Sequence, residues 1–262
     1  MVHRFEDDFL EDMSSYQLKV QFVELSEDFS RHSHTFSEVV VVLGGTAEHV
    51  VGDQAFEITA GDVFVIGGDQ VHGFERVNDL RIINFSFSEK NLLFDREELW
   101  QLPGFAPLFV MAPRLREKGN TVGMLKLGVP DVEFVVSMAQ AVIRQAEQRA
   151  DGYEAVVKLL FQTVVAFLST KYEQTESTVS QNLGLIAAAY HYMEKNLSAD
   201  ITLAGLAESL SVSPRHLERL FRCYCRETPL EHLTELRMSR ALHELAYTDA
   251  PVSNIAALCG FS

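Results

Sequence analysis

Two short segments near the C-terminus share one pattern, and this repeat constrains the fold more than any other feature of the sequence. The first segment, LAESLSVS, runs from Leu206 to Ser213, and the second, IAALCGFS, runs from Ile255 to Ser262. Each begins with an aliphatic residue followed by Ala and ends with a small residue, a hydrophobic residue and Ser. Such self-similarity indicates two copies of one helical supersecondary unit.

The first copy continues into PRHLERLFRCYCR, which predicts a helix-turn-helix. Ser213 is a favourable N-cap residue, and Pro214 stands at the first helical position, where its missing N–H costs nothing. Helical spacing predicts a buried stripe formed by Leu217, Leu220, Phe221 and Tyr224. The N-cap and the remaining face supply the residues that we expect to contact DNA: Ser213, Arg215, His216, Glu218, Arg219 and Arg222.

Arginine can donate to guanine edges or to phosphates, and glutamate can accept from the cytosine amino group. The alternative is that this face is only the solvated side of a helical bundle. The charge distribution favours DNA. Residues 1–180 hold 15 Lys and Arg against 28 Asp and Glu, whereas residues 211–241 hold six Arg against four Glu. This asymmetry, within a net charge of −15, indicates an acidic regulatory domain attached to a nucleic-acid-binding module.

The N-terminal part predicts a β-domain over about residues 16–90. Short β-branched and aromatic segments, such as VVVVL, QAFEIT, DVFVIG and LRIINFSF, alternate with turn signals that include Gly44–Gly45 and Gly67–Asp69. Many short strands without helical periodicity between them favour an antiparallel barrel or sandwich. Residues 88–130 show no clear pattern of helix or strand.

Two helical patterns follow, and together they predict an antiparallel hairpin over about residues 131–173, joined at Asp151–Gly152. The apolar stripes either cover only their own domain or also form a homodimer interface. Residues 174–182 are polar, rich in Ser and Thr and free of apolar periodicity, so they predict a linker. The expected domains are therefore residues 1–173 and 183–262.

Four polar residues of the β-domain suggest a binding site. His32, His34 and Glu38 are separated by even numbers of residues, so on a strand their side chains would point to the same face. His72 follows a Gly-containing turn. Three imidazoles and a carboxylate suit a divalent transition metal, and the same groups can hydrogen-bond a small ligand. Alternatively they lie on a polar rim and have no role. By strand parity, the further candidates for the ligand pocket are His49, Phe64 and Phe74.

The C-terminal region resembles the DNA-binding domain of the AraC/XylS family of transcription regulators, in which a long helix joins two helix-turn-helix units. LAESLSVSPRHLERLF and VSNIAALCGFS carry the resemblance, and between them stand Pro229, His232, Leu233, Arg237, Ala241 and Leu245. The family pattern continues past GFS into another recognition helix. The resemblance therefore implies that the second unit is incomplete at Ser262, the expected N-cap of that helix.

The segments HSHTFSEVVVVLGG and GDVFVIGGDQVH resemble the cupin fold, and their order is closest in character to the sensor halves of L-rhamnose-responsive activators. The resemblance implies a pocket for a small deoxy-sugar, lined by His32, His34, Glu38 and His72, which are also the metal ligands of cupin enzymes. Gly67 stands where cupin enzymes usually have Pro, which puts metal catalysis in doubt.

We therefore expect an α+β protein, with a cupin-like antiparallel β-barrel and a helical hairpin before an all-α DNA-binding domain. The expected function is effector-controlled transcription regulation, with double-stranded DNA, a sugar and RNA polymerase as partners and a homodimer through residues 131–173. We expect that no cofactor is required, and the sequence leaves open whether a divalent metal binds in the pocket. The alternatives are a metal-dependent cupin isomerase or dioxygenase, and a truncated partner that dimerises without binding DNA.

Three cysteines give no disulfide framework, and the N-terminal segment lacks a secretory pattern. The apolar runs are short for a bilayer. A cytoplasmic protein without membrane association is the resulting expectation.

Overall fold

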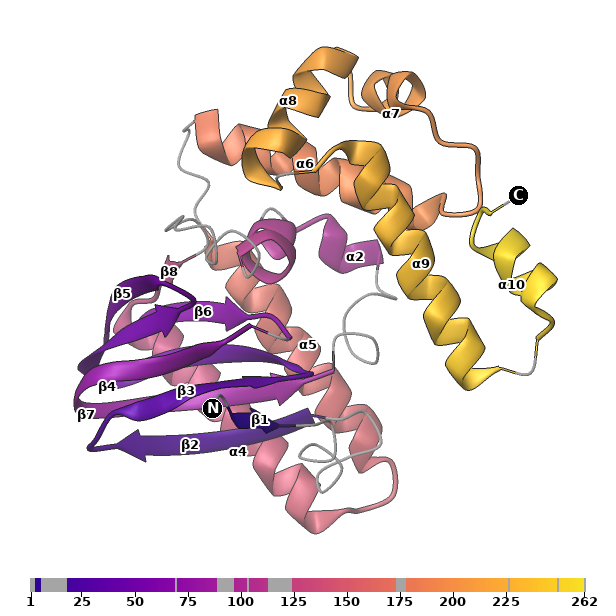
Figure 1. Ribbon diagram of the computed structural model, residues 1–262. Coiled ribbons are helices and arrows are strands. Elements are labelled where there is room, and N and C mark those ends of the chain that lie inside the picture. The colour runs from indigo at the N-terminus through magenta and orange to yellow at the C-terminus, as the bar shows by residue number, and fades with distance from the viewer. Residues whose placement is uncertain are drawn as a thin grey trace. The chain divides into compact units, whose positions relative to one another are not determined.

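A computed structural model describes residues 3–5, 18–68, 70–88, 97–102, 104–112, 124–172, 178–225, 227–248 and 250–261 (Figure 1). The chain forms two compact units, Met1–Gln174 and Thr175–Ser262. The first unit is an antiparallel sheet packed with helices, and the second is helical. The predicted α+β class is confirmed.

The sheet of the first unit has eight strands in the order β1-β3-β7-β4-β6-β8, with β2 paired to β7 and β5 paired to β4. All pairings are antiparallel except that of β1 with β3. Because β8 pairs with β6, the sheet extends beyond the predicted end near residue 90. The strands are β1 (His3–Phe5), β2 (Leu18–Leu25), β3 (Phe29–His34), β4 (Ser37–Val51), β5 (Gln54–Thr59), β6 (Asp62–Ile66), β7 (His72–Phe87) and β8 (Leu125–Lys126).

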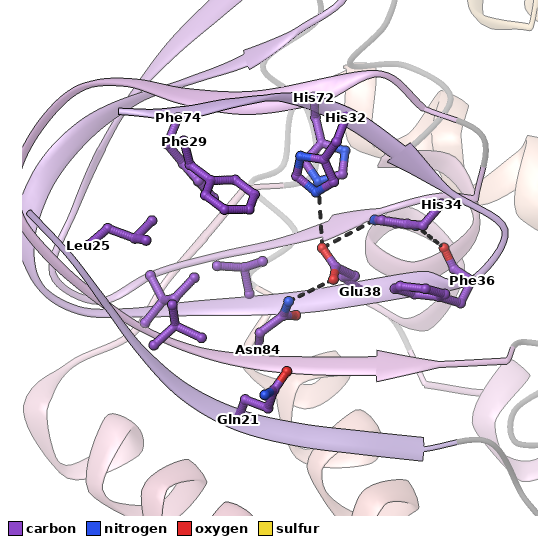
Figure 2. Close-up of a pocket in the computed structure, with 13 residues that line it drawn as sticks. Gln21, Leu25, Phe29, His32, His34, Phe36, Glu38, His72, Phe74 and Asn84 are labelled. Atoms are coloured by element: carbon purple, nitrogen blue, oxygen red, sulfur yellow. Dashed lines mark hydrogen bonds and ion pairs between the residues drawn. The ribbon is translucent and has the colours of Figure 1, made fainter. Parts of the chain in front are cut away.

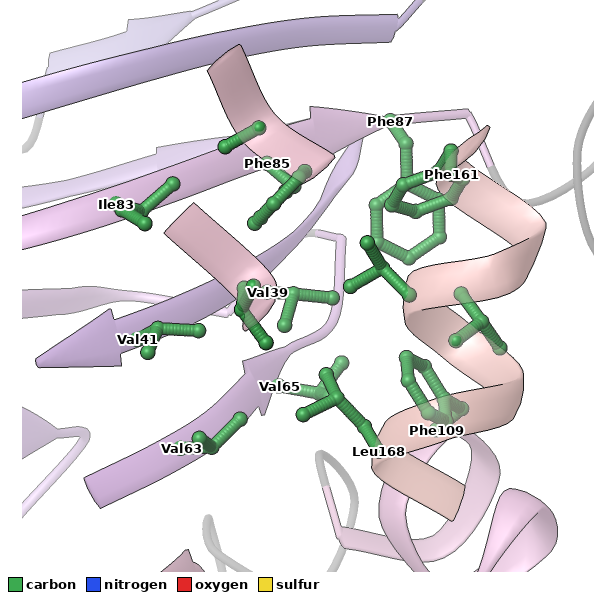
Figure 3. Close-up of a cluster of buried hydrophobic side chains, with 14 of the residues drawn as sticks. Val39, Val41, Val63, Val65, Ile83, Phe85, Phe87, Phe109, Phe161 and Leu168 are labelled. Atoms are coloured by element: carbon green, nitrogen blue, oxygen red, sulfur yellow. The ribbon is translucent and has the colours of Figure 1, made fainter. Parts of the chain in front are cut away.

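Strand β4 is apolar on both faces because each face packs against a different core. Val39 and Val41 belong to a cluster that includes residues of the helices, whereas Val40 and Val42 belong to a second cluster within the sheet. Alternate residues of a strand point to opposite faces, so a strand covered on both sides reads as an unbroken run of valines. Figure 3 shows the first cluster, with Phe161 of a helix lying against Phe87.

Four helices complete the described part of the first unit: α2 (Glu97–Trp100), the π-type helix η2 (Ala106–Met111), α4 (Val129–Gln148) and α5 (Tyr153–Lys171). Helices α4 and α5 form the predicted hairpin, and its connection uses positive φ angles at Arg149 and Gly152. Among the described helices, α5 alone is long and apolar enough to span a membrane by length and composition. Its residues Phe161, Val164 and Leu168 are fully buried in the unit, which is typical of a core helix.

The second unit contains α6 (Thr178–Lys195), α7 (Leu203–Ser209), α8 (Pro214–Tyr224), α9 (Pro229–Tyr247) and α10 (Val252–Leu258). Helices α7 and α8 form the predicted helix-turn-helix. The Ser213 hydroxyl accepts from the backbone N–H of His216 at 3.2 Å, as expected of the N-cap. Leu206, Leu217 and Phe221 are fully buried, and helix α8 is therefore anchored along its apolar stripe.

The predicted linker was too long. Helix α6 begins at Thr178, so residues 178–182 are helical, and residues 174–177 lie outside the described residues. A polar first turn carries no apolar periodicity, and the pattern alone did not detect it. The later turns of α6 are held by the buried residues Ile186, Ala189, Tyr190 and Met193.

Candidate functional site

A cavity of about 230 Å³ lies in the sheet of the first unit, between β2, β3, β4 and β7 (Figure 2). One part of its wall is polar and carries Gln21, His32, His34, Glu38, His72 and Asn84. The rest is apolar and carries Val23, Leu25, Phe29, Phe36, Val40, Phe74 and Ile82. A cavity with a polar side and an aromatic side fits a small ligand that has hydroxyl groups and an apolar face.

The three imidazoles at the polar side are oriented by the backbone. The Nδ1 atoms of His32, His34 and His72 lie 3.1, 2.5 and 3.0 Å from backbone carbonyl oxygens of residues 30, 36 and 70. A carbonyl oxygen only accepts, so each Nδ1 carries the proton. The other ring nitrogen, Nε2, is thereby the one available for a ligand or a metal.

The imidazole of His32 is neutral at cellular pH. Burial lowers its pKa from 6.5 to about 4, with a further lowering by neighbouring His72. The rings of His32 and His72 are 4.2 Å apart between centroids, and His34 stacks on Phe36 at 4.1 Å. The cluster is therefore compact and shielded from water.

Glu38 is the anionic member of the cluster. Burial by itself would raise its pKa, but hydrogen bonding and charge from His34 and His72 hold the pKa well below its usual range. Its Oε2 atom lies 3.3 Å from Nε2 of His34 and 3.6 Å from Nε2 of His72. The carboxyl group is therefore ionised at neutral pH.

This donor set fits a divalent transition metal. Ring nitrogens of His32, His34 and His72 lie within 4.8 Å of one another. Each ring donates its other N–H to a carbonyl, which is the usual support of a histidine ligand. Nε2 of His34 is buried and faces Oε2 of Glu38 at 3.3 Å. A bound metal would be held by these three imidazoles and Glu38 and would supply Lewis acidity to a bound ligand.

The structure brings the four principal predicted residues together, although by a different path from the expected one. Strand β3 ends at His34, the chain bends at Thr35–Phe36, and Glu38 belongs to β4 rather than to the same strand. Both strands pair with β7, and this shared neighbour places the side chains in one cavity. These residues stay candidates for effector and metal binding.

Of the three further pocket candidates, Phe74 lines the cavity, but His49 and Phe64 do not line it. His49 is fully buried and stacks on Phe64 at 4.5 Å, and its ring lies 5.9 Å from that of His72. Strand parity placed His49 and Phe64 on the side of the sheet that carries the cavity, but both residues lie in the core beside it. They do not line this cavity, and their role in effector binding stays a prediction.

Sequence reasoning missed the cavity residues that depend on strand register. Gln21 of β2 stands opposite Asn84 of β7, and both line the polar wall. Phe29 and Phe36 were missed as well. No local pattern distinguishes these residues, because only the pairing of β2 with β7 brings Gln21 to the cavity.

The predicted DNA-contacting residues lie on the outer face of α8. Arg215, Arg219 and Arg222 are exposed, and the buried stripe faces the other way. Arg222 Nη2 lies 3.6 Å from Glu218 Oε1, and Arg219 Nη2 lies 3.1 Å from Nδ1 of His216. An exposed ion pair such as Arg222–Glu218 is weak, and the Arg219–His216 hydrogen bond is exposed as well, so the guanidinium groups can exchange these contacts for phosphates or base edges.

Comparison with known proteins gives two matches to family models. The model described as the AraC-like ligand binding domain matches residues 25–164, and the model described as the helix-turn-helix domain matches residues 206–262. The HTH-type transcriptional activator RhaR of Enterobacter sp. (strain 638) is 28% identical over 234 residues, which cover 89% of this chain and 79% of that protein. RhaS of Pectobacterium atrosepticum is 27% identical over 235 residues, covering 89% and 80%.

Solved structures were also compared. An AraC-type transcriptional regulator from Chromobacterium violaceum is 34% identical over 33% of this chain and 75% of that chain, with a TM-score of 0.30. ToxT from Vibrio cholerae is 12% identical over 95% of this chain and 90% of that chain, with a TM-score of 0.37.

Proposed function

Since this chain belongs to the AraC-type family of transcription regulators, we propose that it controls transcription in response to a small sugar such as rhamnose. The observation that carries this proposal is the match of the AraC-like ligand-binding domain to the part of the chain that forms the cavity. The relatives are transcriptional activators, and this chain is accordingly proposed to be a cytoplasmic regulator rather than an enzyme.

The chemistry of the cavity supports a sugar. Imidazoles, a carboxylate and two amides can exchange hydrogen bonds with several hydroxyl groups. The rings of Phe29 and Phe74 on the apolar wall suit a C–H face or the methyl group of a deoxy-sugar. A buried polar group rejects an analogue that lacks the matching hydroxyl. We therefore expect selectivity among sugars to come from the polar wall.

In the second unit, α8 is proposed to enter the major groove. Arg215, Arg219 and Arg222 would contact guanine edges or phosphates, and Glu218 would accept from cytosine. His216 and the N-cap Ser213 lie at the N-terminal end of the helix, which in helix-turn-helix proteins approaches the bases. RNA polymerase is the expected partner at the promoter.

The protein is proposed to act as a homodimer through the hairpin of α4 and α5. Apolar side chains remain exposed there, namely Val129, Val156 and Leu159, at 73%, 41% and 54%. Exposed apolar residues on adjoining helices suit burial against a second copy. In the dimer, the bound effector would change which relative arrangement of the two DNA-binding units is populated.

A metal-dependent cupin enzyme is the second candidate, and the converging donor set of His32, His34, Glu38 and His72 favours it. The two candidates differ in the fate of the ligand. An enzyme converts a small substrate when a metal is bound, whereas a sensor releases its effector unchanged. Incubation of the metal-loaded protein with candidate sugars, followed by product analysis, separates them.

The regulator proposal is tested by DNA binding. Duplexes selected from a random pool serve to define an operator, and affinity is measured at fixed salt with and without L-rhamnose and related sugars. Arg215→Ala and Arg219→Ala should each weaken operator binding by about 1–3 kcal/mol if they contact bases. Arg144→Ala, an exposed position on α4, is the matched control and should have no effect.

The proposal fails if no duplex is selected or if the two α8 variants bind like the control. A sugar that binds the protein without altering its affinity for the operator would contradict effector control.

A further inference from the structure

The side-chain amide of Asn84 on β7 has a fixed orientation in the cavity wall, where Figure 2 shows it between Glu38 and Gln21. Its Nδ2 atom donates to Oε1 of Glu38 at 2.7 Å. The same oxygen accepts from the Ser86 hydroxyl at 3.1 Å. Because a carboxylate oxygen accepts, the NH₂ group is the side of the amide that faces Glu38, and the carbonyl oxygen Oδ1 faces elsewhere.

The carbonyl oxygen of Asn84 is an acceptor in need of a donor. Oδ1 is buried and makes no hydrogen bond with any residue that the structure describes. Buried polar atoms are nearly always hydrogen-bonded, so such an exception indicates a partner that is not part of the chain. Asn84 as a whole is only partly buried, and it lines the cavity. A ligand in the cavity can therefore supply the donor.

The surroundings of Asn84 indicate which kind of donor fits. Asn84 stands opposite Val40 on β4 and opposite Gln21 on β2, and all three residues line the cavity. Ile82, two residues earlier on β7, lies on the same face and lines the cavity as well. The amide thus lies where the polar wall meets the apolar wall. A hydroxyl group on a carbon ring fits this place, because it donates a hydrogen bond beside a C–H surface, whereas an ether oxygen or a fluorine brings no donor.

The volume of the cavity restricts the ligand further. At about 230 Å³ it lies below the range of about 300–1,000 Å³ that is typical of pockets for drug-sized ligands. A single sugar ring therefore fits the cavity better than a larger ligand does.

We propose that Asn84 is a specificity-determining residue whose Oδ1 accepts a hydrogen bond from one hydroxyl group of the bound sugar. This inference rests on the proposed function of the cavity as a sugar sensor. A ligand without a donor at that hydroxyl position leaves Oδ1 buried and unsatisfied, and a site built to hydrogen-bond a hydroxyl rejects such an analogue. The analogue is expected to bind about 10- to 100-fold more weakly than the parent sugar.

The test is a calorimetric titration of the full chain with L-rhamnose, L-mannose and L-fucose. The sugar that binds most tightly is then compared with its deoxyfluoro analogues, in which fluorine replaces one hydroxyl at a time and removes the donor. In the unmodified protein, one of these replacements should weaken binding by about 10- to 100-fold through the loss of its bond to Oδ1. In Asn84→Ala, the parent sugar and that analogue should bind equally, as expected when the two changes remove the same interaction.

Ser86→Ala separates this role from the positioning of Glu38. Ser86 donates to the same oxygen of Glu38 but is not among the residues that line the cavity. Its variant should therefore weaken the parent sugar and the analogue by the same factor and keep the difference between them. Asn78→Ala, at an exposed residue of the same strand, should bind both as the unmodified protein does. If Asn84→Ala fails to fold, Asn84→Leu keeps a branched side chain without polar atoms and should show the same loss of discrimination.

The inference is overturned if a sugar binds but Asn84→Ala keeps every difference between the parent sugar and its analogues. The sugar sensor then stands, and a water molecule rather than the sugar satisfies Oδ1. If none of the three sugars binds, the proposed sensing of a rhamnose-like sugar fails, and this inference fails with it.

Discussion

Gly45 is a residue at which the sheet accepts no side chain. Its φ is +75°, and an added Cβ would lie 2.1 Å from the backbone oxygen of Asp79. The Gly44–Gly45 pair suggested a turn, yet β4 runs through it, with register shifts against β7 on both sides of Gly44. These glycines mark a β-bulge inside a long strand, where the chain bends and a neighbouring backbone comes close.

This geometry predicts different costs for two glycine substitutions. Gly45→Ala combines a left-handed backbone with overlap against Asp79 and should lower the free energy of unfolding by at least about 3 kcal/mol. Gly52 also has a positive φ, of 56°, but no atom lies within 4 Å of its added Cβ. Gly52→Ala should cost about 1 kcal/mol, from backbone strain alone. Urea denaturation measures both, and equal costs would contradict the role assigned to the overlap.

At the scale of elements, the start of α9 is held by a reciprocal cap. The Thr228 hydroxyl accepts from the N–H of Glu231 at 3.2 Å, and the Glu231 carboxylate accepts from the N–H of Thr228 at 2.7 Å. These bonds to Thr228, followed by the charge of Arg222, lower the pKa of Glu231 below its ordinary value of 4.5. The ionised carboxylate is therefore the form that stabilises the helix.

The cap predicts a pH dependence for Glu231→Gln. A carboxyl group whose pKa is lower in the folded state stabilises that state above its unfolded pKa, and this contribution is lost as pH falls through the folded value. The variant should therefore be less stable than the unmodified protein at pH 7, and the difference should shrink as the pH falls below 4.5. Thr228→Ala should cost about 1 kcal/mol at pH 7.

Denaturation followed by helical circular dichroism at several pH values measures these effects. Glu208→Gln, exposed on α7, serves as the control and should show no such pH dependence. A constant difference between Glu231→Gln and the unmodified protein across this range would argue against the cap.

The elements also show which parts of the fold were predictable. Helices α7 and α8 followed from the sequence because their signals are local: Ser213 caps, Pro214 starts the helix, and the apolar stripe has helical spacing. Strands β1 and β8 have three and two residues and exist only through pairing with β3 and β6, so no local pattern reveals them.

The same contrast applies to the candidate site. The spacing of His32 and His34 predicted that they share a face, because parity decides which face of a strand a residue occupies, whereas Glu38 of β4 joins them only because both strands pair with β7. Strand parity does not say how deep a residue lies, and fully buried His49 lies in the core beside the cavity rather than in its wall. Strand parity also does not give the register between strands that are distant in the sequence. That register brings Asn84 Nδ2 to within 2.7 Å of Glu38 Oε1. Both need the folded sheet.

At the scale of the whole molecule, one side of α5 is buried in its unit and another side is exposed and apolar. Its residues Phe161 and Leu168 are buried in the unit, whereas Val156 and Leu159 are 41% and 54% exposed. Residues three apart lie on one face of a helix, so these two form a single exposed apolar surface. Burial of such a surface against a second copy would explain why the helix is apolar on nearly all sides.

Leu159→Arg should therefore separate the proposed dimer into monomers, because the substitution buries an unpaired charge in the interface. Sedimentation equilibrium of the full chain should show at least about a tenfold weaker association, a change of about 1.4 kcal/mol. Leu242→Arg, at a residue of α9 that is 60% exposed, controls for the added charge and should leave the association unchanged. If the hairpin only covers its own domain, Leu159→Arg and the unmodified protein will sediment alike, and the apolar surface of α5 then has no role in assembly.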